Sequence, residues 1–292
     1  MNDRRNFLRT VSAVTVAAAG WPALPACTPS GELDRAPEAP ANPTDRLERI
    51  GVQLYTVRAA MRDDVGATLA RVADIGYQEV EFAGYFDHKP ADIRRMLDDN
   101  DLTAPAAHVP LEQLEGQTTE LVDLAKTIGH EYLILAWLAQ TDWNSVAALQ
   151  RTADRFNRIG EALNAAGLKF AYHNHDFEFA TVGSRTVYST LLAECDPALV
   201  QFEMDLFWIT KGGGDPMAAF AAHPGRFPCV HVKDMAADGA MVDVGAGEID
   251  FAKLFAQRES AGVHHFFVEH DAPEDPFASI TASHAALRSL RF

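Results

Sequence analysis

Eight polar side chains follow short apolar runs in this sequence, and together they offer the donor atoms of a metal-dependent active site. They are Glu81, His108, His173, His175, Asp205, His231, Lys233 and Glu269. A charge in an apolar setting such as 202–208 needs a partner or a metal. Imidazole nitrogens mixed with carboxylate oxygens suit a divalent ion such as Mn, Co, Zn or Fe. A lone histidine or glutamate is more often structural, so the prediction depends on their joint occurrence.

The runs that carry these residues alternate with longer amphipathic stretches. Strands are predicted over 50–55, 79–82, 103–109, 132–136, 169–175, 200–205, 227–233 and 265–269, and a helix is expected after each. Apolar strands separated by helices are typical of a parallel sheet that is covered on both faces. The pattern predicts an α/β fold, a single (β/α)8 TIM barrel over residues 49–292. An open doubly wound sheet is the alternative, but no glycine-rich fingerprint follows the first strand.

A barrel would place the eight side chains at one mouth. Active sites of such barrels lie at the C-terminal ends of the strands. Because side chains alternate along a strand, His173 and His175 share one face, and His231 and Lys233 share another. Lys233 also stands next to Asp234 and could form a structural ion pair with it.

The first residues have the pattern of an export signal. Arg4 and Arg5 precede an apolar run from Val11 to Ala19, which resembles a twin-arginine signal. The stretch 24–27 resembles a lipobox, so we expect a signal peptide over 1–26 and acylation of Cys27, with cleavage elsewhere as the alternative. A proline-rich linker over 27–48 follows. These features predict a periplasmic lipoprotein that the twin-arginine machinery exports and a lipid anchor holds at the membrane.

The charge of the chain argues against a nucleic acid partner. The net charge is -16 and no stripe of lysine and arginine is present, which argues against nucleic acid binding. Cys195 and Cys229 could pair in an exported chain, but Cys229 lies in an apolar run, and two buried free thiols are expected.

Five short motifs carry a family resemblance. Val80-Glu81-Phe82, Tyr172-His173-Asn174-His175, Glu203-Met204-Asp205, His231-Val232-Lys233-Asp234 and Val268-Glu269-His270 occur in the order and spacing of the xylose isomerase-like barrel superfamily. They are more closely similar to proteins labelled sugar phosphate isomerase/epimerase, over nearly all of residues 50 to 290. The resemblance also implies a homodimer, since relatives often pair.

The resemblance implies one divalent ion with ligands from strands five to eight. Asp205, His231 and Glu269 match the family pattern, whereas His173 stands where relatives have a glutamate. His175 or Glu178 could supply that fifth-strand ligand instead. In epimerases the missing glutamate is one of two carboxylates that move a proton across a sugar carbon.

The implied chemistry is enolisation of a sugar. An ion that binds a carbonyl and the adjacent hydroxyl makes the neighbouring C–H removable. Reprotonation gives an isomerase or epimerase of an unphosphorylated sugar or keto-sugar. Loss of a β-substituent gives a lyase or dehydratase of a 3-keto-glycoside or ketopolyol, and His173 adds weight to this alternative. A non-catalytic sugar-binding lipoprotein is the alternative of another class.

The expected roles follow from the same resemblance. Glu269 would be both metal ligand and base. His175, Lys233 and Glu81 would move protons or bind hydroxyls. The predicted substrate-binding residues are His108, Glu178, Trp137 and Trp208, and the two indole rings could stack on a sugar ring.

Overall fold

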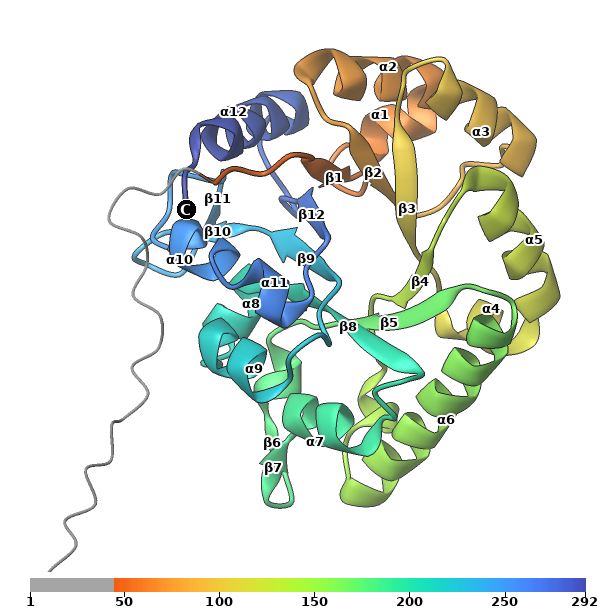
Figure 1. Cartoon of the computed structure of the whole chain (residues 1–292), viewed down its shortest axis with the longest axis vertical. Helices are drawn as coiled ribbons and strands as arrows, with labels where there is room; N and C mark the ends of the chain where they lie inside the picture. The colour runs from red at the N-terminus through yellow and green to blue at the C-terminus, as the bar shows by residue number, and fades with distance from the viewer. Residues whose placement is uncertain (1–44) are drawn as a thin grey trace, which may run out of the picture. The chain divides into compact units, whose positions relative to one another are not determined.

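Eight parallel strands form a closed barrel in this computed structural model, which describes residues 45–292 (Figure 1). The strands are β1 (Gly51–Gln53), β2 (Glu79–Phe82), β3 (Thr103–His108), β4 (Tyr132–Leu135), β5 (Lys169–His173), β8 (Val200–Asp205), β9 (Cys229–Val232) and β12 (His265–Val268). The first strand pairs with both the second and the last, which closes the sheet. The predicted TIM barrel is confirmed, and the open sheet is excluded.

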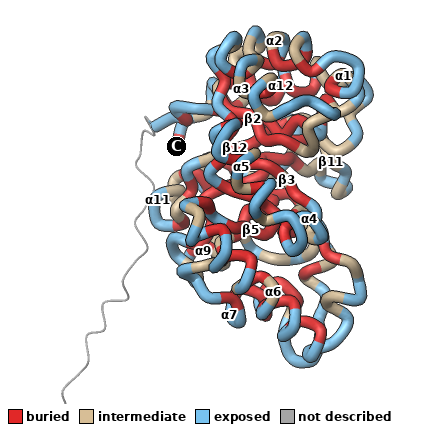
Figure 2. Tube along the Cα trace, turned by 90° about the vertical axis from the view of Figure 1, so that its right-hand side faces the viewer, coloured by how far each residue is buried: buried red, intermediate tan, exposed pale blue. Residues whose placement is uncertain are grey.

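Helices surround the barrel and connect successive strands. They are α1 (Arg58–Asp63), α2 (Val65–Ile75), α3 (Pro90–Asp98), α4 (Leu111–Gly116), α5 (Thr118–Ile128), α6 (Val146–Ala165), α7 (Val187–Glu194), α8 (Leu206–Lys211), α9 (Pro216–Ala222), α10 (Phe251–Phe255), α11 (Arg258–Ala261) and α12 (Pro276–Ser289). Three of these short helices, α1, α4 and α8, were not expected, and the helix predicted over 250–261 is divided into α10 and α11. Figure 2 shows the buried segments in the central strands and the exposed ones over the outer helices.

Short turns and two hairpins lie at the mouth of the barrel. The 3-10 turns are η1 (Gln140–Asp142) and η2 (Phe177–Phe179), and the hairpins pair β6 (Thr181–Val182) with β7 (Arg185–Thr186) and β10 (Asp234–Met235) with β11 (Met241–Val242). Asp234 holds the last of these loops. Its carboxylate accepts hydrogen bonds from four backbone N–H groups, those of Met235, Gly245, Gly247 and Ile249.

The barrel interior has an apolar floor beneath a polar upper layer. The floor consists of Ala106, Tyr132, Ile134, Ala171, Cys229 and Phe267, a cluster separate from the larger core between strands and helices. Gly51 admits the Phe267 ring, because a Cβ there would lie 2.5 Å from it. The register then sets the layer above, pairing His173 with Glu203 and Asp205 with His231 on neighbouring strands.

The described chain begins against the barrel. Asp45 exchanges two backbone hydrogen bonds with Phe292, and the Leu47 side chain is buried. The export signal, Cys27 and residues 28–44 of the linker lie outside the described residues. Within 45–292, no helix has the length and apolarity needed to cross a membrane. Cys195 and Cys229 are both buried and free, as expected.

His130 should make the stability of the fold depend on pH. Its Nδ1 donates to the Ala104 carbonyl at 2.6 Å, so Nε2 accepts from the Tyr85 hydroxyl at 2.9 Å. Burial lowers the pKa of His130 from 6.5 to about 4. The neutral ring therefore contributes stability above pH 6.5, and this contribution is lost as the pH falls toward 4. We therefore expect wild type to be more stable than His130→Gln at neutral pH. This difference in the free energy of unfolding should decrease by about 3 kcal/mol as the pH falls from 6.5 to 4.

Denaturant titrations at several pH values would check this difference. His88→Gln, which removes an exposed imidazole, is the control. If the stability difference between wild type and His130→Gln were the same at pH 7 and pH 4, His130 would not be the group responsible.

Candidate active site

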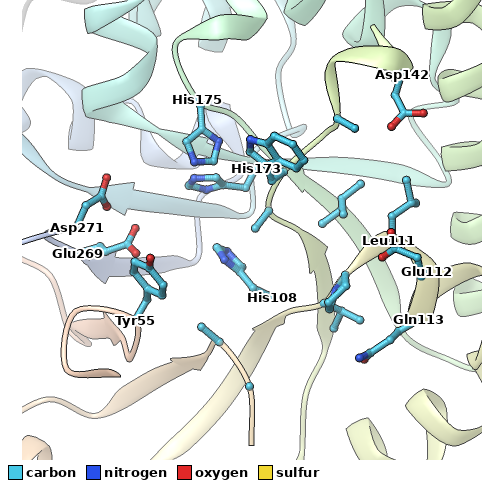
Figure 3. Close-up of a pocket in the computed structure, with 18 of the residues that line it drawn as sticks. Tyr55, His108, Leu111, Glu112, Gln113, Asp142, His173, His175, Glu269 and Asp271 are labelled. Atoms are coloured by element: carbon cyan, nitrogen blue, oxygen red, sulfur yellow. The ribbon is translucent and has the colours of Figure 1, made fainter. Parts of the chain in front are cut away.

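A cavity of about 730 Å³ opens at the C-terminal ends of the barrel strands (Figure 3). One half of its wall is polar and is formed by Tyr55, His108, His173, His175, Lys233, Glu269 and Asp271. The other half is mainly apolar and includes Val109, Pro110, Leu111, Leu135, Ala136 and Trp137, with Glu112, Gln113 and Asp142 nearby. The size and the mixture of apolar wall and convergent polar groups suit a small-molecule site.

His231 lies at the centre of the buried layer below this cavity. Its Nδ1 is 2.8 Å from Glu269 Oε2, and its Nε2 is 2.6 Å from Glu81 Oε2. Because both nitrogens face carboxylates, the pKa of His231 is raised well above its usual value, even though burial opposes the charge. Burial and the neighbouring Glu203 charge raise the pKa of Glu81.

Glu203 joins three imidazoles through one oxygen. Its Oε2 is 2.8 Å from His108 Nε2, 3.1 Å from His173 Nδ1 and 3.1 Å from His231 Nε2. Glu203 belongs to the motif Glu203-Met204-Asp205, but no role was predicted for it. The signal was its position two residues before Asp205, which places both side chains on the inward face of β8.

Lys233 neutralises a second group of acidic residues. Its Nζ is 2.6 Å from Glu269 Oε2, 2.7 Å from Asp271 Oδ1 and 3.0 Å from Asp205 Oδ2. The contact with Asp205 lacks hydrogen-bond geometry, so Asp205 Oδ2 is buried without a hydrogen bond. The alternative ion pair with Asp234 is not formed, since that carboxylate binds backbone amides.

The protonation states differ between neighbouring groups. Burial would raise the pKa of Glu269, but Lys233 and His231 outweigh it and hold the pKa well below its usual value. Burial raises the pKa of Asp205 to about 6 despite Lys233. Burial also lowers the pKa of His173, and it lowers that of His175 to about 3 together with the Lys233 charge. At neutral pH, Glu269 is ionised and His173 and His175 are neutral.

Three predicted ligands, His173, His231 and Glu269, converge around the fourth, Asp205. Its Oδ2 lies 3.7 Å from His173 Nε2 and 3.9 Å from His231 Nδ1, and Glu269 Oε2 lies 2.8 Å from that same Nδ1. Asp205, His231 and Glu269 form one group whose donor atoms are close enough to share an ion. Two nitrogens and two oxygens, one of them a buried oxygen without a hydrogen bond, fit a divalent ion.

Three other predicted residues lie in different positions. Glu178 is buried behind the cavity wall, where it accepts hydrogen bonds from the His175 backbone N–H at 2.8 Å and from the Tyr172 hydroxyl. Trp208 is partly buried, with Lys233 Nζ 5.8 Å from its ring, and does not line the cavity. Trp137 lines the cavity and is 59% exposed.

Two amide side chains and two residues of the wall were missed by sequence analysis. Asn174 Oδ1 accepts from the Asp205 backbone N–H at 3.1 Å, and Gln53 Nε2 donates to Glu81 Oε2 at 2.8 Å. Asp271 and Tyr55 line the cavity from the loops after β12 and β1. The buried amides stand at strand ends like the other polar residues, so their positions were the available signal.

Comparison with known proteins places this chain in a family. A sequence profile described as xylose isomerase-like TIM barrel matches residues 69–291. The chain belongs to this family. It is also 28% identical to a sugar phosphate isomerase/epimerase from Parabacteroides distasonis ATCC 8503, whose structure it matches over 83% of this chain and 98% of that chain with a TM-score of 0.73.

Two further relatives widen the comparison. An inosose dehydratase of Geobacillus thermodenitrificans (strain NG80-2) is 27% identical over 143 residues, which are 42% of this chain and 46% of that protein. The chain therefore matches less than half the length of this curated relative. The IOLI protein, whose structure contains a zinc atom, is 17% identical with a TM-score of 0.67 over 84% of this chain and 99% of that chain, which shows a shared fold.

Removal of the Lys233 ammonium should leave buried carboxylates unpaired. We expect Lys233→Met to lower the free energy of unfolding by about 3–5 kcal/mol in metal-free buffer, the usual cost of breaking a buried ion pair. A divalent ion can replace the lost charge, so added Zn²⁺ or Mn²⁺ should raise the melting temperature more in the variant than in wild type.

Thermal and denaturant unfolding with and without the ions would measure both effects. Lys211→Met is the control, because that ammonium donates to the Gly239 carbonyl on the surface. Equal responses to the ions in Lys233→Met and wild type would argue against a cation site beside Lys233.

Proposed function

We propose that the chain removes the proton next to the carbonyl of an uncharged polyhydroxy ketone and then eliminates a β-hydroxyl group as water. The observation that carries this proposal is the pairing of two unlike groups on one cavity wall. Glu269 is an ionised carboxylate, and His108 is an imidazole held by carboxylates through Nε2. The β5 position holds His173, not a second carboxylate, so the site favours one base and one acid.

The donor set supports a role for a bound divalent ion. His173, Asp205, His231 and Glu269 would hold it, and when bound it would polarise the ketone carbonyl. The zinc atom in the IOLI structure is consistent with such an ion in this fold.

The side chains account for both proton transfers. Glu269 takes the proton from the α-carbon, and the electron pair of that C–H bond moves toward the carbonyl oxygen. The electron pair then forms a carbon–carbon double bond as the β C–O bond breaks, and an N–H of His108 supplies the proton that turns the leaving hydroxyl into water. His108 recovers a proton from solvent, and Glu269 releases one to it. Proton transfer of this kind typically contributes about 10²–10⁴ in rate.

Protonated His108 is consistent with this role. Burial lowers the pKa of His108, but the nearby Glu81 and Glu203 charges outweigh burial and raise the pKa overall. Because Nε2 faces these two carboxylates, Nδ1 is the nitrogen left to donate into the cavity.

The relatives support both outcomes of enolisation. The inosose dehydratase favours elimination from a ketopolyol. Isomerisation or epimerisation is the second candidate, favoured by the sugar phosphate isomerase/epimerase, which this chain matches over almost all of that protein.

The charges around the cavity favour a substrate without phosphate. Among the described residues that line it, Lys233 is the one lysine or arginine, and three carboxylates already surround its ammonium. Glu112 and Asp142 add further negative charge. A phosphate group would meet net repulsion here, whereas neutral hydroxyl groups would find many hydrogen-bond acceptors.

Isotope exchange tests the proposal, and the variant His108→Asn separates proton removal from elimination. The ion-loaded protein would be incubated in D2O with inososes, free ketoses and 3-keto-glycosides. We expect deuterium at the carbon next to the carbonyl and a product that has lost water or, from a glycoside, its aglycone. His108→Asn should keep the exchange and reduce elimination by about 10²–10³.

The matched control is His265→Asn, since His265 also binds a buried glutamate, Glu79, at the opposite end of the barrel. A labelled product of unchanged mass would indicate isomerisation or epimerisation instead. Absence of exchange with every substrate would overturn the proposal, and equal loss of both steps in His108→Asn would overturn the role of that residue.

Trp137 should bind the substrate without taking part in the proton transfers. Its ring is exposed on the apolar half of the wall and lies edge-on to Phe177, with ring centroids 6.5 Å apart. A ring that packs against the substrate contributes about 1–2 kcal/mol to the free energy of binding. Trp137→Ala should therefore raise KM about 10-fold and change kcat little. Val146→Ala removes another exposed apolar side chain outside the cavity and is the control. An unchanged KM would exclude contact between Trp137 and the substrate.

A further inference from the structure

Glu203 is a fully buried carboxylate that takes no part in the proposed proton transfers. We propose that Glu203 is a positioning residue that fixes the hydrogen placement of His173 and, together with Glu81, that of His231, so that Nε2 of His173 and Nδ1 of His231 face the ion site at Asp205. This inference depends on the ion-binding part of the proposed function.

Glu203 faces His173 as its hydrogen-bond partner, and it faces His231 together with Glu81, whose Oε2 lies 2.6 Å from His231 Nε2. Its Oε2 is 3.1 Å from His173 Nδ1 and 3.1 Å from His231 Nε2, and the opposite nitrogens of these rings lie 3.7 and 3.9 Å from Asp205 Oδ2. An ionised carboxylate only accepts hydrogen bonds, so both nitrogens that face Glu203 must carry hydrogen. The hydrogen bond on one ring nitrogen decides which nitrogen is available to a metal.

Glu203 is suited to stay ionised while buried. Its side chain is fully buried, and three imidazoles contact the same oxygen. A neutral carboxylic acid here could donate its own hydrogen to one ring and leave that ring in the wrong tautomer. The cluster of imidazoles around a single oxygen favours the charged acceptor.

The position of Glu203 also explains how a histidine can serve on β5. His173 and Glu203 are direct neighbours in the register of β5 and β8. A glutamate ligand has equivalent oxygens, but a neutral imidazole binds an ion only through the nitrogen that lacks hydrogen. Glu203, beside His173, keeps hydrogen on Nδ1 and so leaves Nε2 available to the ion.

A second ion among His108, His173, Glu203 and His231 is the competing interpretation, since their donor atoms also lie close together. It would use the nitrogens that already contact Glu203 directly. The two interpretations use different nitrogens of His173, Nδ1 for the second ion and Nε2 for the site at Asp205, so the placement of hydrogen on His173 separates them.

Glu203→Gln tests the proposal through ion affinity. The amide keeps the shape of the side chain but replaces the charged acceptor with a neutral carbonyl oxygen or, in the other orientation, with an N–H2 donor. We expect Zn²⁺ or Co²⁺ affinity, measured by chelator competition, to weaken about 10–100-fold. Glu79→Gln is the matched control, because Glu79 is a buried barrel glutamate that accepts from His265 at 2.9 Å far below the site. Its ion affinity should equal that of wild type.

Nitrogen-15 spectra of the histidines provide a readout that loss of stability alone would not change. In the ion-loaded wild type, hydrogen should be on Nδ1 of His173 and on Nε2 of His231. This measurement decides the question even if Glu203→Gln fails to fold. The opposite placement of hydrogen, an affinity of Glu203→Gln within 2-fold of wild type, two ions per chain or no ion in wild type would each overturn the proposal. Normal ion binding without ketone turnover would overturn the proposed reaction and leave the role of Glu203 intact.

Discussion

The mouth of this barrel depends on compensation of buried negative charge. Asp205 and Glu269 share the Lys233 ammonium, and Glu81 and Glu203 share the His231 imidazolium. Each carboxylate alone would be expensive to bury, and each becomes tolerable through a cation that another strand of the barrel provides. Since Lys233 and His231 both come from the end of β9, that strand end connects the two groups of charges.

The barrel makes this compensation geometrically possible. Its apolar floor, with Phe267 packed over Gly51, fills the lower interior and excludes water beneath the charges. Side-chain alternation then sends every second residue of adjacent strands into the upper layer. Two amides complete the arrangement, because Asn174 fixes the backbone at Asp205 and Gln53 orients Glu81. Most of the network is therefore held by side chains at the ends of barrel strands, with Asp271 added from a loop.

Sequence alone predicted the strands well and the contacts between them less well. The segments 79–82 and 200–205 have the expected bounds, because apolar runs flanked by turns are a local signal. The meeting of His173 with Asp205 followed from barrel topology. The role of Glu203 did not, because it depends on the register between β5 and β8, which no local pattern encodes. Asp271 was missed for a related reason: it lies in a loop whose path depends on tertiary packing.

Histidine on β5 changes the charge balance of the whole site. A glutamate there would bring the donor set to three carboxylates, Asp205 included, and Lys233 alone could not neutralise them. With His173, two carboxylates and two imidazoles remain, so a divalent ion that takes the place of the proton on His231 Nδ1 would bring the donor set to neutrality. Nitrogen donors also shift preference from hard ions such as Mg²⁺ toward transition metals. The same replacement removes a basic carboxylate from one side of the cavity. In the proposed site, ion preference and the asymmetry between acid and base would therefore both depend on His173, and a substitution there should alter the two together.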